Sequence, residues 1–137
     1  ANAAYQNICR ERNLTPVTVE HWTQIPAVPT SLFKELELTA LAPTERTAVF
    51  HSSGTTEQIP SRHFHNAKSL AVYEASLWKW FHTQFSEVSK LFFLTPKSSV
   101  VPHSSLVHMF ETVRKMSGES ESAFTGLLSK DGCDHTE

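Results

Sequence analysis

Apolar residues recur along this chain with two different spacings, and each spacing is typical of one kind of secondary structure. The longest segment with the three-and-four spacing of a helix runs from Ala67 to about Phe85, after Asn66 as an N-cap. Its apolar stripe consists of Ala67, Leu70, Ala71, Leu77, Trp78, Phe81 and Phe85. The same spacing predicts a helix within residues 1–12 and another that Ser104 or Ser105 caps and Gly118 ends. The core-facing residues of this last helix are predicted to be Leu106, Met109, Phe110, Val113 and Met116.

Other segments show the shorter spacing of strands. Thr47–Ser53 alternates, and Ser61–His65 is predicted to pair with it antiparallel. Lys90–Leu94 is a continuous apolar run, which predicts a strand buried on both faces and parallel to its predecessor after the helical crossover. We therefore expect an α/β fold with a small mixed sheet flanked by helices.

The 137 residues are close to the commonest size of one domain, so we expect a single domain with one core. Residues 1–46 read as a helical lead-in that contains short helical turns and prolines. Residues 47–128 read as a strand-loop-strand-helix-strand-helix core, and residues 129–137 as a frayed tail.

Charge and composition narrow the classes of partner. Twelve basic and 14 acidic residues give a net charge of −2, which does not favour binding to nucleic acid or to an anionic membrane surface. No apolar run approaches the ~20 residues that span a bilayer, and the N-terminus lacks a basic segment followed by an apolar one. The two cysteines, Cys9 and Cys133, are too few and too far apart for a disulfide framework. We expect a cytoplasmic protein with no membrane span.

The loop between the first two predicted strands carries the candidate chemistry. Four hydroxyl side chains surround one glycine here, and Arg62 follows at the start of the next strand. Hydroxyls and backbone N–H groups of such a loop hold phosphate oxygens, and a guanidinium adds a planar cation suited to phosphate. The candidate phosphate-binding residues are Ser52, Ser53, Gly54, Thr55, Thr56 and Arg62. A polar hairpin turn without a ligand is the alternative.

Three histidines flank the same loop. His63 and His65 share one face of their predicted strand, and we expect His51 near them across the hairpin. Zinc binding would need a fourth ligand or an open catalytic position with further support. Histidines that orient the loop or face solvent are therefore the favoured interpretation, and no metal site is assigned.

The loop resembles a known motif. Ser52-Ser53-Gly54-Thr55-Thr56 followed by Pro60 is similar to the Ser/Thr-Gly-Thr-Thr-Gly-x-Pro-Lys loop of adenylate-forming ligases. Flanking segments resemble more specifically the acyl-protein synthetases, the fatty-acid-activating components of bacterial bioluminescence reductases. These segments are Trp22 with Ile25–Lys34, Pro60–His63, and Pro102–Leu106 with Met109. The similarity extends from about Tyr5 to about Leu127.

The resemblance implies a fold like part of the N-terminal domain of these ligases and an activity on ATP with Mg²⁺. A fatty carboxylate would be activated as an acyl-adenylate and then transferred to a protein cysteine. The loop would bind the β- and γ-phosphates or the departing pyrophosphate. The partner would be an acyl-CoA or fatty acid reductase.

The chain departs from the family pattern in the loop and in length. Glu57 replaces the second glycine of the loop, and the lysine of the wider superfamily is absent, although Ser61-Arg62 fits the acyl-protein synthetase variant. Family enzymes are several hundred residues long, so we expect this chain to be the N-terminal portion of such an enzyme and inactive alone. The alternative is a non-catalytic nucleotide- or phosphate-binding module, or a protein-interaction module.

Overall fold

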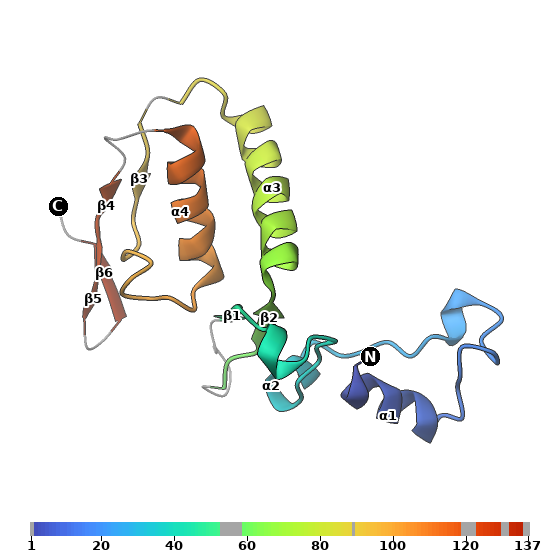
Figure 1. Cartoon of the computed structure of the whole chain (residues 1–137). Helices are drawn as coiled ribbons and strands as arrows, with labels where there is room; N and C mark the ends of the chain where they lie inside the picture. Colours follow the sequence, from blue (N-terminus) through green and yellow to red (C-terminus); the bar gives the residue numbers. More distant parts are fainter. Residues whose placement is uncertain (1, 53–58, 89, 119–122, 130–131, 136–137) are drawn as a thin grey trace. The chain divides into compact units, whose positions relative to one another are not determined.

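A computed structural model describes residues 2–52, 59–88, 90–118, 123–129 and 132–135 (Figure 1). The chain divides into two compact units, Ala1–Asn66 and Ala67–Glu137. Both units contain helices and short strands, so the mixed α/β class that we expected is confirmed.

The first unit begins with the predicted N-terminal helix. Helix α1 spans Ala3–Glu11, and the side chain of Asn2 caps it by accepting a hydrogen bond from the backbone N–H of Tyr5 at 2.9 Å. Three short helical segments follow in the lead-in: η1 (Trp22–Gln24), α2 (Leu32–Glu35) and η2 (Pro43–Glu45).

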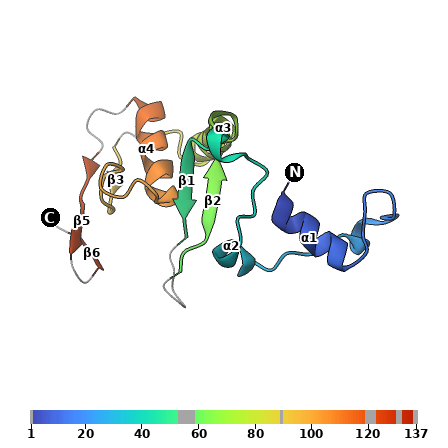
Figure 2. The ribbon, with the colours of Figure 1, turned by 60° about the horizontal axis from the view of Figure 1, so that its bottom comes forward.

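The predicted hairpin closes the first unit. Strands β1 (Ala48–His51) and β2 (Arg62–His65) pair antiparallel, as Figure 2 shows. Phe50 lies opposite His63 and is the buried aromatic residue of this hairpin. The hairpin was predictable because alternation and a polar, glycine-containing connection are both local features of the sequence.

The second unit is built on the two long predicted helices. Helix α3 spans Ala67–Gln84, and α4 spans Ser105–Ser117 beside it (Figure 1). The Ser104 side chain caps α4 by accepting from the N–H of Val107 at 3.3 Å. Gly118 ends the helix with φ of 69°, a left-handed conformation that glycine adopts without steric cost.

Our prediction of a single mixed sheet is wrong. The described strands form three separate two-stranded sheets: β1 with β2, β3 (Phe92–Phe93) with β4 (Ala123–Phe124), and β5 (Gly126–Ser129) with β6 (Gly132–His135). Strand β3 therefore pairs in parallel with β4, and β2 is not its hydrogen-bonded neighbour. Strands β5 and β6 pair antiparallel in the segment where we expected a frayed tail from residue 129.

The predicted buried faces also need correction. Strand β3 is buried on one face only, because Phe93 is 5% exposed while Phe92 is 65% exposed. In α4 the buried residues are Val107, Thr112 and Val113, whereas the predicted core residues Leu106 and Met116 are about half exposed. Ala67 and Ala71 of α3, and Phe85 directly after it, are exposed rather than part of a buried stripe. Local spacing identified these helices, but their buried side depends on which elements pack against them.

A close backbone approach fixes the start of β5. A Cβ atom at Gly126 would lie 2.7 Å from the Cα of Thr95, and the N–H of Gly126 donates to the Thr95 carbonyl at 3.1 Å. Only glycine lets the two backbones come this close. None of the helices in the described ranges is both long and apolar enough to cross a membrane.

Candidate functional site

The candidate loop leaves β1 and enters β2, and a pair of serines joins its two ends. The backbone N–H of Ser52 donates to the carbonyl of Ser61 at 3.1 Å. In return, the N–H and the hydroxyl of Ser61 both donate to the hydroxyl oxygen of Ser52, at 3.0 and 2.8 Å. These bonds continue the hairpin ladder by one step and fix where the loop begins. Ser53, Gly54, Thr55, Thr56 and Glu57 lie outside the described residues.

A histidine extends this pair into a chain of hydrogen bonds. Nε2 of His63 lies 2.9 Å from the hydroxyl oxygen of Ser61. Which of these two atoms donates depends on the tautomer of the His63 ring. The oxygen of Ser52 then accepts two hydrogen bonds, and its own proton remains to be donated. Because Ser52 is exposed, that proton can reach a ligand oxygen.

Sequence reasoning did not assign Ser61 to the site. Ser61 is only 7% exposed, and it links His63 to Ser52. The signal was present in the predicted hairpin, because a serine that faces another serine across the last ladder position can form such a pair.

Arg62 lies on the other face of β2 from Ser61 and His63, because successive strand residues alternate. Its Nη1 lies 3.5 Å from Glu37, which also binds Nη1 of Arg46 at 2.9 Å. Arg46 in turn stacks over the ring of Phe64, with its guanidinium carbon 4.3 Å from the ring centre. Arg62 is thus one of two arginines that share a carboxylate, and the described residues do not bring it to Ser52.

The three histidines do not form one cluster. His51 pairs with Arg62 in the register, whereas His63 pairs with Phe50 and His65 with Ala48. Directly paired residues share a face, so His51 lies on the opposite face from His63 and His65. Our expectation that His51 lies near the other two is therefore wrong. The described ranges contain no group of three or more histidine, cysteine or acidic side chains that could hold a metal ion.

The carboxylate beside this hairpin does not fit a Mg²⁺ site. Mg²⁺ prefers oxygen ligands, especially carboxylates and phosphates. Glu37 is the acid that packs against β2, and Arg46 and Arg62 already neutralise it.

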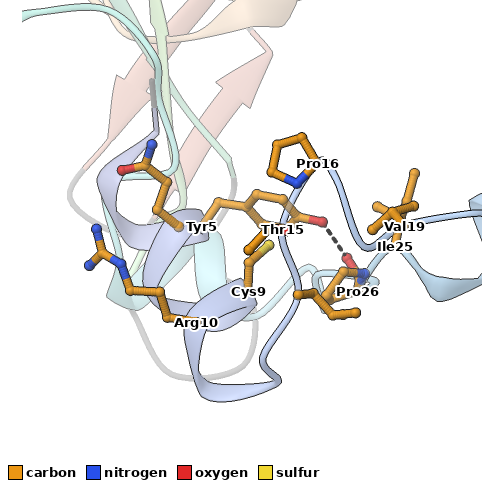
Figure 3. Close-up of a pocket in the computed structure, with 10 residues that line it drawn as sticks. Tyr5, Cys9, Arg10, Thr15, Pro16, Val19, Ile25 and Pro26 are labelled. Atoms are coloured by element: carbon orange, nitrogen blue, oxygen red, sulfur yellow. Dashed lines mark hydrogen bonds between the residues drawn. The ribbon is translucent and has the colours of Figure 1, made fainter.

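The first unit also has an open, mostly apolar pocket of about 470 Å³ beside Cys9 (Figure 3). The hydroxyl of Tyr5 crosses to the carbonyl of Pro26 and donates a hydrogen bond of 2.9 Å. Burial raises the pKa of the Tyr5 hydroxyl, and the neighbouring Cys9 thiol acts in the same direction, so Tyr5 stays a donor at neutral pH. Cys9 is half-buried.

Comparisons with protein-family models, with curated proteins and with solved structures find no match to this chain. The link to acyl-protein synthetases rests on the residues of the loop and its flanking segments.

Proposed function

We propose that this chain contributes the phosphate-binding loop to an ATP-dependent activation of a fatty carboxylic acid. One observation supports the loop as a ligand site: the chain His63–Ser61–Ser52 ends in an exposed hydroxyl at the base of the loop. A hydroxyl that already accepts two hydrogen bonds is polarised and becomes a better donor to a phosphate oxygen.

The residues have distinct tasks in this proposal. Thr55, Thr56 and Ser53 donate to the β- and γ-phosphate oxygens together with Ser52, and Gly54 lets the backbone approach them. A carboxylate oxygen of the fatty acid then attacks the α-phosphorus, and the bond from that phosphorus to pyrophosphate breaks. The loop holds the departing pyrophosphate and stabilises its charge, which is the main contribution of a protein to displacement at phosphorus.

Several further expectations accompany this function. Mg²⁺ would accompany ATP, and Glu37 would not be its ligand because that carboxylate is already paired. The acyl group passes to a protein cysteine, and an acyl-CoA or fatty acid reductase is the partner that consumes it. A cytoplasmic location suits an enzyme that uses ATP and thiols.

A second candidate is a phosphate-binding module without catalysis. The ion pair between Arg62 and Glu37 favours this second candidate. Because Arg62 is engaged there, the described part of the hairpin offers the loop's hydroxyls no cation. Hydroxyls and backbone N–H groups alone suffice to bind phosphate, whereas catalysis at phosphorus depends on charge stabilisation.

Calorimetry on the whole chain tests the loop. We expect pyrophosphate and ATP to bind, and the double variant Thr55→Ala/Thr56→Ala to weaken both by at least tenfold. Thr44→Ala is the matched control, because Thr44 is an exposed threonine of η2. If pyrophosphate does not bind, or binds the double variant equally, the loop is an ordinary turn and both candidates fail.

Pyrophosphate exchange separates the two candidates. We expect no decanoate-dependent exchange between pyrophosphate and ATP with the purified chain alone, because Arg62 is paired with Glu37 and the described part of the hairpin brings no other cation to the loop. Exchange above the level of the Thr55→Ala/Thr56→Ala variant would contradict this expectation and assign the full activity to these residues.

A further inference from the structure

The second unit contains an apolar cavity of about 510 Å³ formed by α3, α4 and β3. Its volume lies within the range of small-molecule sites, ~300–1,000 Å³. No charged residue is among those that line it in the described part of the chain.

The mouth of this cavity is open and aromatic. Trp80 of α3 is 63% exposed and Phe92 of β3 is 65% exposed, although both line the cavity. The floor is well packed, because Phe93 stacks on Phe110 with ring centres 4.9 Å apart and Val113 is almost fully buried. A molecule can therefore enter past the exposed rings and contact a rigid apolar floor.

Thr95 is the residue that suggests a ligand. Its hydroxyl oxygen is buried, and the described residues offer it no hydrogen-bond partner. A buried hydroxyl without a partner is destabilising, so its presence calls for an unseen partner. Apart from the Trp80 indole, the described lining has no second polar side chain, and a water molecule needs two to four polar partners to be held. A ligand with one polar group satisfies Thr95 better than water.

We infer that this cavity binds the alkyl chain of a neutral acyl compound, whose carbonyl oxygen accepts a hydrogen bond from the Thr95 hydroxyl. The described lining holds no cation, so a carboxylate buried there would be an unpaired charge, which is very costly. An ester, a thioester or a mixed anhydride keeps the chain and removes the charge. The choice of an acyl compound rests on the proposed function, whereas the need for a neutral, mostly apolar ligand rests on the cavity itself.

The test uses methyl decanoate and decanoate, which share the acyl chain and differ in charge. Calorimetry on the whole chain without nucleotide is expected to show binding of the ester and at least tenfold weaker binding of the carboxylate. Equal binding of the two, or no binding of the ester, would overturn the inference.

Two variants locate the binding. Thr95→Val keeps the shape of the side chain and removes the hydroxyl, so the ester should bind about three- to tenfold more weakly, the usual effect of one hydrogen bond. The melting temperature of the free variant should stay equal or rise, because a polar group without a partner has been removed. Unchanged ester affinity in Thr95→Val would overturn the assignment of the hydroxyl.

Leu106→Trp should block the cavity from its rim and abolish ester binding. The matched control is Val72→Trp, because Val72 is 64% exposed on α3 and does not line the cavity. Equal loss of ester binding in the control, or no loss in Leu106→Trp, would contradict the assignment of the ester to this cavity.

The Thr55→Ala/Thr56→Ala variant should bind the ester normally. A chain that does not bind pyrophosphate would therefore refute the loop proposal alone. A chain that does not bind the ester would refute the cavity proposal alone.

Discussion

The hydroxyl of Ser61 donates to the hydroxyl of Ser52 across 2.8 Å, where the hairpin of β1 and β2 opens into its loop. Ser61 is buried and also donates its N–H to the same oxygen. Ser52→Ala therefore removes the acceptor of two donors at once. We expect a loss of about 1–3 kcal/mol in the free energy of unfolding, the usual cost of leaving buried donors unpaired.

Denaturant melts of Ser52→Ala and Ser99→Ala measure this loss. Ser99 is an exposed serine and should change stability by less than about 0.5 kcal/mol. If the two variants melt alike, the bonds between Ser52 and Ser61 do not stabilise the hairpin.

Phe92 and Phe93 are a natural pair for testing the corrected core. Phe93 stacks on Phe110 and lies 4.8 Å from the ring centre of Phe124, while Phe92 is mostly exposed. Phe93→Ala should cost about 3–5 kcal/mol in the free energy of unfolding, as for other buried aromatic residues. Phe92→Ala should cost less than about 1 kcal/mol. Equal costs in urea melts would restore the earlier view of a strand buried on both faces.

Local sequence signals predicted the helices and the hairpin, whereas contacts between residues far apart in the chain determine how the remaining strands pair. The ends of α4 were predictable because Ser104 and Gly118 act within one turn of the backbone. The partner of β3 was not, because its pairing with β4 joins residues about thirty positions apart and involves only two residues of each strand. No spacing pattern records such a short ladder.

The same limit applies to the candidate site. The loop sequence predicted Ser52 as a candidate phosphate-binding residue, but it could not predict the pairing of Arg62 with Glu37, which joins residues 25 positions apart. Thr95 follows an apolar run, and nothing in this pattern indicated that its hydroxyl is buried without a partner among the described residues. Buried polar groups become visible only when the elements that cover them are placed.

Glu111 predicts a dependence of stability on pH. Two nitrogens of Arg114 donate to its carboxylate at 3.0 and 2.8 Å, and Lys115 lies 3.5 Å away. The hydrogen bonds from Arg114 lower the pKa of Glu111 below its ordinary value of 4.5. The pair therefore stabilises the fold fully above that ordinary value, and the contribution disappears as the pH falls through the lowered pKa.

Glu111→Gln should thus be less stable than the parent at pH 7, by about 1 kcal/mol or less because solvent reaches the pair. The difference should vanish once the pH is below the lowered pKa of the parent's Glu111. Urea melts across this range measure it, with Glu87→Gln as an exposed control. A difference that persists unchanged into acid would show that Glu111 acts through packing rather than through its charge.

Glu37 should restrain Arg62 from reaching a phosphate. Its carboxylate binds Arg46 and Arg62 together, and all three side chains are partly exposed. Glu37→Gln should raise pyrophosphate affinity about two- to tenfold, because it releases the guanidinium and removes a negative charge near the hairpin. Adding Arg62→Ala should cancel most of this gain in calorimetric titrations. A gain that survives Arg62→Ala would mean that Arg62 does not contact the anion.

Glu57 offers the sharpest test of the phosphate loop, because it replaces a glycine of the family motif. A carboxylate 4 Å from a phosphate charge is repelled by about 1 kcal/mol in water and about 4 kcal/mol at an effective dielectric constant of 20. Each 1.4 kcal/mol corresponds to about a tenfold change in affinity. Glu57→Gly should therefore tighten pyrophosphate binding by about tenfold or more, since it removes the charge and restores a permissive backbone.

Glu57→Gln separates charge from backbone freedom. It should recover only the electrostatic part of the gain, and that part should shrink as salt rises, because ions screen exposed charges within ~10 Å at 0.1 M. The additional gain of Glu57→Gly over Glu57→Gln should persist at high salt, because it comes from backbone conformation. Titrations of both variants with pyrophosphate at low and high salt measure the two parts. If neither variant changes the affinity at either salt concentration, Glu57 does not lie beside a bound phosphate and the loop lacks the proposed geometry.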